Sequence, residues 1–279
     1  QIEFLREVNL GGRKTVGKRV GIVGGGNTAL DAARTARRLG AEKVYIYYRR
    51  THFEIPADEL EVQAALEEGI EVVYLCAPSK IIVEKGRLKG LELIRMEMVG
   101  VDESGRRRPV PVKGSEFTVE LDNLFPAISQ KPDLGFLPDG FKVSARNTVE
   151  ADPGTMMTDS PGVFAGGDVV AGPYFATDAM GHGKLAAKYM DRYLRGGDMT
   201  PEYTRTMPVA HVEPYEMTAE EVETIVNRAE TTMQPVAERI QNFESVELVL
   251  DEAAAVNEAK RCLRCDWRWE HEAEEEEKR

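Results

Sequence analysis

The pattern of hydrophobic and polar positions predicts alternating strands and helices in the first part of the chain. Residues 19–23 (RVGIV) form a short apolar run that is typical of a strand buried in a parallel sheet. The next segment carries alanine and leucine on one side and arginine on another, as an amphipathic helix does. Strand, helix, strand, helix and strand in this order predict a doubly wound parallel α/β sheet, Rossmann-like in its class. The predicted strands are 19–23, 44–48 and 70–75; the predicted helices are one that runs to about Leu39 and one over 57–68, with Leu60, Val62, Ala64 and Ala65 facing inward.

The pattern changes after the third predicted strand. Residues 80–84, 87–99 and 117–121 are rich in β-formers and are separated by turns such as Lys85-Gly86, which predicts an antiparallel β-meander. The basic run Arg106-Arg107-Arg108 is expected on a solvated hairpin tip; the alternative is a role in binding phosphate.

The second half of the chain suggests another domain and a tail. Residues 125–133 (FPAISQKPD) look like a crossing point, and residues 158–168 (TDSPGVFAGGD) predict a turn, a buried strand over 163–165 and an exposed carboxylate at Asp168. Helices are expected over 177–194, 218–233 and 252–260, before a Glu-rich end. We therefore expect three parts: a nucleotide-binding domain over 1–124, the C-terminal lobe of a second domain over 125–200, and an extended, helical segment over 201–279.

The glycine turn after the first strand is the principal chemical signal. It reads G-x-G-x-x-A, with Gly24 for the tight turn, Gly26 for close approach of a pyrophosphate, and Ala29 for helix–strand packing. Amides in the first helical turn, at Asn27 and Thr28, would face the phosphates. Such triplets also occur in ordinary turns, but the flanking strand and helix favour a dinucleotide site.

The end of the second predicted strand bears on the choice of nucleotide. An acidic residue there suits the ribose 2′-hydroxyl of NAD, and a basic one suits the 2′-phosphate of NADP. This chain has Arg49-Arg50, which favours NADP. The alternative is that both arginines are solvated or pair with Glu54 or Asp58.

Composition narrows the class of protein. The chain has 279 residues, with 42% hydrophobic and 30% charged residues, which is the composition of a globular protein with a real core. A formal net charge of -12 argues against general nucleic-acid binding. No apolar run approaches the roughly 20 residues of a membrane span. The sequence shows no signal-peptide pattern and few cysteines, so we expect a cytoplasmic location.

The motifs in their order are similar to a known family. The stretch GKRVGIVGGGNTALDAARTARRLGAEKVYIYYRR, then Ile55-Pro56-Ala57, AISQKPD and SPGVFAGGD, closely resembles the small (beta) chain of glutamate synthase and the wider family of NAD(P)H flavoproteins with two dinucleotide domains. The ending ERIQNFESVELVLDEAAAVNEAKRCLRCD resembles family members that feed iron–sulfur proteins. The resemblance covers most of residues 1–269 and implies the C-terminal portion of such a protein, with another chain or segment supplying the N-terminal half of the FAD site.

The same resemblance implies roles for particular residues. Asp168 would bind the ribitol or pyrophosphate region of FAD beside Gly167, and Ser129 stands where relatives usually have glycine. The other residues implied at the FAD site are Ala127, Ile128, Gln130, Thr177 and Ala179. The chemistry would be hydride transfer between nicotinamide and flavin, so no side-chain nucleophile or general base is expected. The four histidines show no metal-ligand spacing; His182 lies nearest the expected flavin end of its helix.

Cys262 and Cys265 form a C-x-x-C pair with three interpretations. They could ligate an iron–sulfur cluster (a 4Fe-4S cluster, with ligands from elsewhere), act as a redox pair, or pack as small hydrophobic residues. Cys76 is expected in the core.

The leading hypothesis is an NADPH-dependent FAD oxidoreductase module that passes electrons to an iron–sulfur cluster or partner subunit. The alternative is a non-catalytic nucleotide-binding or scaffold subunit of a larger redox complex.

Overall fold

The computed structural model describes residues 1–101, 107–138, 140–173, 175–202, 215–224 and 227–261. These fall into two compact units. The first contains Gln1–Ile128 and Glu213–Cys265, and the second contains Ser129–Val212 and Asp266–Arg279. The first unit thus joins two segments that are far apart in the sequence. The unit boundary after Ile128 lies close to the domain boundary expected after residue 124.

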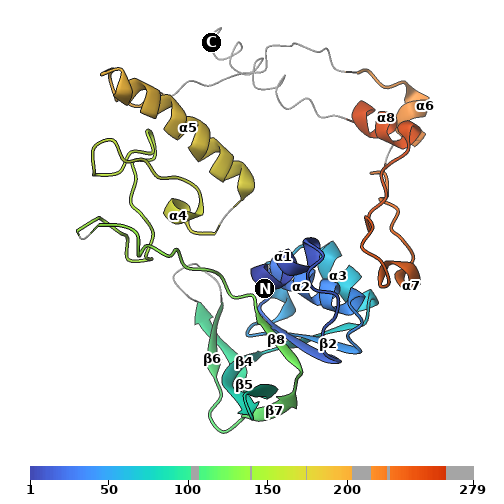
Figure 1. The fold of residues 1–279 in the computed structure, drawn as a ribbon. Helices are drawn as coiled ribbons and strands as arrows, with labels where there is room; N and C mark the ends of the chain where they lie inside the picture. The colour runs from blue at the N-terminus through green and yellow to red at the C-terminus, as the bar shows by residue number, and fades with distance from the viewer. Residues whose placement is uncertain (102–106, 139, 174, 203–214, 225–226, 262–279) are drawn as a thin grey trace. The chain divides into compact units, whose positions relative to one another are not determined.

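A four-stranded parallel sheet forms the centre of the first unit, in the order β3-β2-β1-β8 (Figure 1). Its strands are β1 (Arg19–Val23), β2 (Lys43–Tyr48), β3 (Ile70–Tyr74) and β8 (Asn123–Pro126). The helices around it are α1 (Ile2–Asn9), α2 (Asn27–Arg38) and α3 (Glu59–Glu67), with the short 3-10 helix η1 (His52–Glu54) after β2. A second, antiparallel sheet contains β4 (Cys76–Glu84), β5 (Arg87–Val101), β6 (Arg107–Pro111) and β7 (Phe117–Glu120).

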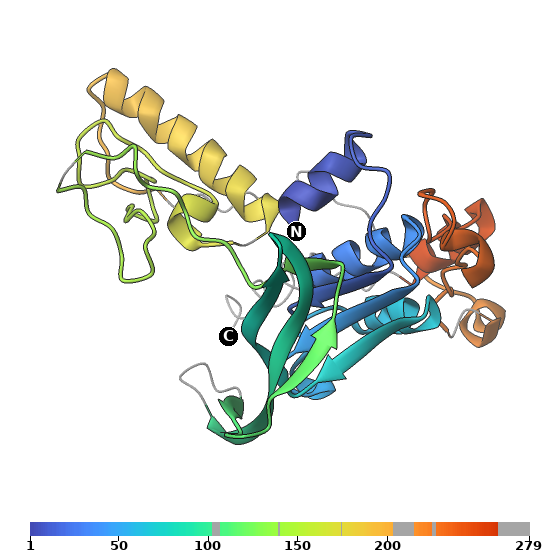
Figure 2. The same ribbon diagram turned by 60° about the horizontal axis from the view of Figure 1, so that its bottom comes forward.

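The two faces of the parallel sheet are covered differently (Figures 1 and 2). Ile22 and Ile46, on one face, pack with residues of α1, α2 and α3 such as Leu30. Their neighbours Val23 and Tyr47 point the other way, as strand alternation requires, and pack with Leu91 and other residues of the antiparallel sheet. Helices therefore cover one face and the predicted meander covers the other, which confirms a Rossmann-like α/β fold with a β-meander.

A C-terminal strap, residues 232–248, packs on α2 and α3 of the same unit. Its ends pair through an isolated bridge between Met233 and Glu247, and α7 (Val236–Arg239) lies between them. The helices α6 (Ala219–Thr224) and α8 (Glu252–Lys260) flank the strap in sequence. Lys260 of α8 forms an ion pair with Glu221 of α6 at 2.6 Å.

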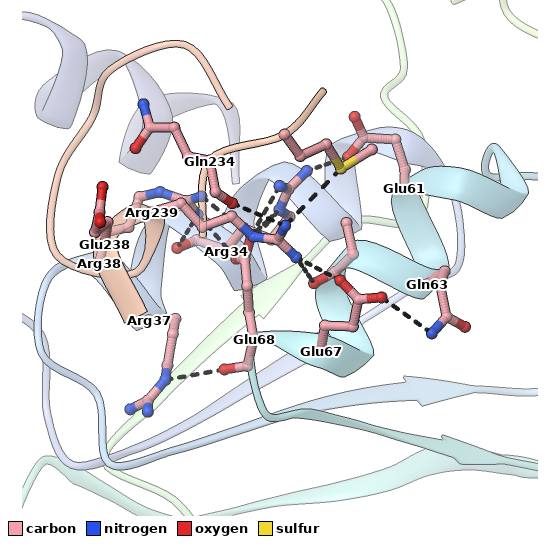
Figure 3. Close-up of polar contacts among 12 residues, drawn as sticks. Arg34, Arg37, Arg38, Glu61, Gln63, Glu67, Glu68, Gln234, Glu238 and Arg239 are labelled. Atoms are coloured by element: carbon pink, nitrogen blue, oxygen red, sulfur yellow. Dashed lines mark hydrogen bonds and ion pairs between the residues drawn. The ribbon is translucent and has the colours of Figure 1, made fainter. Parts of the chain in front are cut away.

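Six charged residues hold the strap in place, and we call them the charge cluster (Figure 3). Glu68 is completely buried and accepts hydrogen bonds from Arg34, Arg38 and Arg239. Arg239 also donates to Glu67 at 2.8 Å and to the carbonyl oxygen of Ala64 at 3.3 Å. Arg34 reaches Glu61 as well. Three guanidinium groups thus meet three carboxylates, and the strap supplies one of the six.

Burial alone would lower the pKa of Arg34. The hydrogen bonds to Glu68 and the negative charges of Glu68 and Glu61 outweigh this effect, so the pKa is raised. The Arg239 guanidinium likewise lowers the pKa of Glu67. The charges therefore compensate one another, and the completely buried Glu68 is the carboxylate that depends most on its arginine partners.

The second unit contains α4 (Asp168–Ala171), α5 (Ala176–Leu194) and several turns. Tyr189 of α5 is completely buried, and its hydroxyl accepts a hydrogen bond from the backbone amide of Glu202 at 2.7 Å. The expected strand over 163–165 is reduced to a single bridge between Met157 and Phe164, and Val163 is 41% exposed. The glycines and proline around it limit the segment to turns.

Two other expectations differ from the structure. Leu60 is 66% exposed, because α3 begins after its cap Asp58 with Ala64 and Ala65 turned to the core. The helix expected to reach Met233 is described only to Thr224, and Met233 lies in the strap, where the pairing of Gln234 with Val246 extends the chain. Among the described helices, none is long and apolar enough to span a membrane.

Candidate dinucleotide-binding site

The glycine turn lies between β1 and α2, at the carboxyl end of the central strand. Gly24 has a φ of 146°, and a side chain there would meet the carbonyl oxygen of Ala127 at 2.3 Å. The amide of Ala127 in turn donates to the carbonyl oxygen of Val23 at 2.7 Å. Only glycine permits both the backbone angle and this close approach of the chain after β8.

Gly26 and the start of α2 leave an open cradle. A side chain at Gly26 would meet nothing within 4 Å, and its φ of -88° is ordinary for any residue. No side chain caps the amino end of α2, and no described residue accepts a hydrogen bond from the backbone amides of Asn27 or Thr28. Ala29, completely buried, holds the helix against the sheet. The open space, unsatisfied amides and helix dipole together fit a pyrophosphate.

The loop after β2 closes against this turn. The ring of Tyr48 packs on Gly25, and its hydroxyl donates to the carbonyl oxygen of Glu54. Ala57 donates its amide to the carbonyl oxygen of Gly25 at 3.2 Å, and Asp58 donates its amide to Oδ1 of Asn27 at 3.0 Å. The loop and the glycine turn therefore form one continuous rim.

The two arginines at the end of β2 occupy different environments. Arg49 is exposed, and no described residue forms a hydrogen bond or ion pair with it. Arg50 is 5% exposed, and its Nε donates to the carbonyl oxygen of Arg107 on β6 at 3.0 Å. Arg49 alone presents its guanidinium to solvent, while Arg50 joins β2 to the meander.

Glu54 lies beside this pair, but not as a partner of either arginine. Its carboxylate accepts hydrogen bonds from the side-chain hydroxyl and the amide of Thr51, which lower its pKa, with a further contribution from the charge of Arg107. Nη1 of Arg107 lies 3.5 Å from Oε1 of Glu54. Arg107 and Arg108 are exposed, as predicted, but they lie in β6 and not on a hairpin tip, and Arg106 lies outside the described residues. Arg107 is also adjacent to the loop after β2.

Several residues expected at an FAD site lie in the second unit. Gly167 begins α4 next to Ala179 of α5, and its amide donates to Nδ1 of His182 at 3.0 Å. Asp168 is exposed, and no described residue accepts or donates a hydrogen bond at its carboxylate. Thr177 is exposed in the first turn of α5. The structure therefore brings Gly167, Asp168 and Ala179 together, with His182 holding the turn.

The remaining FAD-site residues follow β8. Ala127 and Ile128 belong to the first unit, and Gln130 belongs to the second. Ser129, between them, has a φ of 87°, a backbone conformation that favours glycine, which agrees with glycine being usual there in the family that the motifs resemble.

The cysteines divide into one core residue and a pair outside the described residues. Cys76 is buried, donates to the carbonyl oxygen of Val73, and has its pKa raised by burial to about 11, which confirms it as a core thiol. Cys262 and Cys265 lie outside the described residues, as do His211 and His271. Within the described part of the chain, no group of three or more His, Cys, Asp or Glu side chains is arranged to hold a metal ion.

Comparison with known proteins identifies the family. Residues 2–183 match the pyridine nucleotide-disulphide oxidoreductase family. The chain belongs to this family. It is 41% identical to the NADP(+)-dependent formate dehydrogenase subunit beta of Moorella thermoacetica, over 95% of this chain and 38% of that protein. It is 38% identical to the NADPH-Fe(3+) oxidoreductase subunit beta of Geobacter sulfurreducens, over 95% and 44%.

The comparison also confirms the resemblance to glutamate synthase. The chain is 35% identical to the glutamate synthase [NADPH] small chain of Azospirillum brasilense, over 68% of this chain and 40% of that protein. The predicted family of pyridine-nucleotide oxidoreductases is confirmed. The chain spans about two-fifths of the length of these relatives.

Solved structures of thioredoxin reductases share the fold. The T. acidophilum enzyme has a TM-score of 0.53 and 24% identity, over 68% of this chain and 55% of that chain. The Lactococcus lactis enzyme has a TM-score of 0.54 and 22% identity, over 65% and 55%. At this level of identity the likeness confirms the α/β fold class.

Proposed function

We propose that this chain is part of an NADPH-dependent FAD oxidoreductase, in which hydride passes between nicotinamide and flavin and electrons continue to an iron–sulfur cluster or partner subunit. The observation that carries the proposal is the open cradle formed by Gly24, Gly26 and the uncapped start of α2, with Arg49 exposed at the end of β2. The relatives that match most of the chain include redox subunits whose names specify NADP(+) or NADPH.

The residues of this chain would bind and orient the two cofactors. The amides of Asn27 and Thr28 would hold the pyrophosphate of NADPH, and Arg49 would meet its 2′-phosphate. Asp168, with no partner among the described residues, would accept hydrogen bonds from hydroxyl groups of FAD, and Thr177 and Ala179 would lie near it. When bound, the nicotinamide and flavin supply the hydride chemistry, so the protein needs no nucleophile or general base of its own.

His182 has a positioning role in this proposal. Its Nδ1 accepts the hydrogen bond from the amide of Gly167, which fixes the orientation of the ring. The ring thereby holds the turn that presents Asp168.

Gly26 provides the test. In the full-length protein, Gly26→Val should leave folding and FAD content unchanged, because a Cβ at this position meets no protein atom within 4 Å and the space beyond it is open. It should weaken NADPH binding by about a hundredfold, because the added methyl groups occupy the space of the phosphates. We expect NADPH to bleach the flavin absorbance of the wild type under anaerobic conditions and not that of the variant, while dithionite bleaches both.

Two results would contradict the proposal. If the full-length protein retains no FAD, even within its native complex, the chain is better described as a non-catalytic nucleotide-binding or scaffold subunit. If Gly26→Val is reduced by NADPH as rapidly as the wild type, the cradle is not the nicotinamide-nucleotide site.

A further inference from the structure

The end of β2 offers fewer positive charges for binding a phosphate than its two consecutive arginines suggest. Of the two consecutive arginines, Arg50 is buried and its Nε is committed to the backbone of Arg107. Arg49 remains exposed as one guanidinium. A phosphate dianion is usually held by more than one charged donor, and arginine forks suit this geometry best.

The hydrogen bond from Arg50 brings a second exposed guanidinium to the same rim. It joins the end of β2 to the first residue of β6, so the side chain of Arg107 emerges next to the loop after β2. That side chain is 52% exposed and touches Oε1 of Glu54 at 3.5 Å, which is longer than a good hydrogen bond. The guanidinium has five donor hydrogens, so most of its donor capacity stays available.

Glu54 explains why a second arginine is needed there. One of its oxygens is held by Thr51, and the other faces Arg107. An uncompensated carboxylate at the rim would repel a 2′-phosphate and would suit a ribose hydroxyl instead. Arg49, Arg107 and Glu54 together carry one net positive charge; without Arg107 they carry none.

We propose that Arg107 of β6 is a specificity-determining residue that, with Arg49 directly after β2, binds the 2′-phosphate of NADP(H) and neutralises Glu54. This inference rests on the proposed function, since it assigns a selectivity element to the same nucleotide site. Arg50 has a different role as the buried brace that places Arg107 at the rim.

The neighbouring residue Arg108 is a matched control. It has the same side chain and is also exposed, but successive residues of a strand point to opposite faces. The register shift at this point lies on β5, where Gly100 is the extra residue between Val99, opposite Arg108, and Val101, opposite Arg107, so Arg107 and Arg108 remain consecutive residues of β6. Arg108→Ala therefore removes the same charge as Arg107→Ala, but from a side chain that points to the opposite face of β6.

The test compares NADP+ and NAD+ binding to the full-length protein by calorimetry, since the two differ only in the 2′-phosphate. Arg107→Ala should weaken NADP+ binding roughly ten- to a hundredfold, the range expected for lost charge-assisted hydrogen bonds. NAD+ binding should stay within about threefold of the wild type or improve, because Glu54 becomes available to a ribose hydroxyl. Arg108→Ala should leave both unchanged, and Arg107→Lys should recover part of the NADP+ affinity.

Each alternative result has a definite meaning. If Arg107→Ala affects NADP+ no more than Arg108→Ala does, or weakens NADP+ and NAD+ equally, the inference is wrong while the proposed function stands. If the wild type binds neither nucleotide, the proposed function fails, and the inference fails with it. Thermal denaturation of each variant separates loss of binding from loss of folding.

Discussion

Two groups of arginines in the first unit differ in burial and in the number of carboxylates that they contact. In the charge cluster, Arg34, Arg38 and Arg239 are buried and converge on the completely buried Glu68. At the nucleotide rim, Arg49 has no partner among the described residues and Arg107 has one long contact with Glu54.

The difference separates stabilisation from binding. A buried charge must be paired by the protein itself, because desolvation without a partner costs several kcal/mol. An exposed arginine can keep its donors for a ligand, because water satisfies them until the ligand arrives. The same residue type, within one unit of the fold, thus joins chain segments in one place and is available to bind an anion in the other.

The largest expected effect is that of removing the shared carboxylate. Glu68→Ala leaves three guanidinium groups around a site with no central negative charge, so the free energy of unfolding should fall by about 3–5 kcal/mol. Urea denaturation of the full-length protein would measure it. Glu59→Gln, an exposed change at the start of the same helix α3, is the control and should alter it by less than about 0.5 kcal/mol. A loss of under 1 kcal/mol for Glu68→Ala would show that the cluster is not the structural feature that we infer.

Removing the arginine supplied by the strap should cost less, since Glu68 keeps two partners. Arg239→Ala should lower the free energy of unfolding by about 2 kcal/mol through the loss of hydrogen bonds to charged groups. It should also speed limited proteolysis within residues 232–248. Glu238→Gln, an exposed change one residue away, should do neither. Equal proteolysis of Arg239→Ala and the wild type would mean that other contacts hold the strap.

A partly buried ion pair outside both groups gives a smaller, pH-dependent effect. The ammonium group of Lys260, with hydrogen bonds from Thr218 and Tyr215, lowers the pKa of Glu221 from 4.5 to about 2. A depressed carboxyl pKa contributes stability above the unfolded value, and that contribution is lost as the pH falls from 4.5 toward about 2. Hydrogen exchange of α8 should therefore accelerate in this window. In Glu221→Gln the exchange should already be fast and should change little with pH; a wild-type rate that stays flat would contradict the pairing.

The smallest effects on stability are expected at the rim. Arg49→Ala and Arg107→Ala should each change the free energy of unfolding by less than about 0.5 kcal/mol, because Arg49 pairs with no described residue and the half-exposed Arg107 makes one long contact, with Glu54. The same urea titrations would measure this. A cost above about 2 kcal/mol for Arg107→Ala would place this residue with the structural arginines and remove the contrast between the two groups.

The sequence predicted the strand, turn and helix of the candidate nucleotide site well, because their signals are local. Each of these elements can be recognised from a few consecutive residues: the apolar run of β1, the glycine turn and the amphipathic pattern of α2. The strand β1 and the helix α8 have the predicted bounds. The turn residues Gly24 and Gly26 also lie where the motif requires, although their ligand contacts remain predictions. Local periodicity is informative wherever an element packs against its sequence neighbours.

The parts that were missed depend on contacts between distant residues. Arg239 and Glu68 are 171 positions apart, and no local sequence pattern indicates that they form an ion pair. Leu60 illustrates the same limit, since α3 alone could be turned to bury it, but the packing of Ala65 on the parallel sheet leaves it exposed. Arg107 was recognisable as basic, but only the pairing of Arg50 with its carbonyl oxygen places it at the rim.

The anchored strap has a consequence for how the nucleotide-binding domain can be expressed or transplanted. A recombinant fragment that stops after residue 128 would contain the whole parallel sheet and the glycine turn, but it would lack Arg239. Glu68 and the helix surface under the strap would then face water. A self-contained version must join residues 1–128 to residues 232–248, through a linker or a circular permutation, so that both pieces fold as one body.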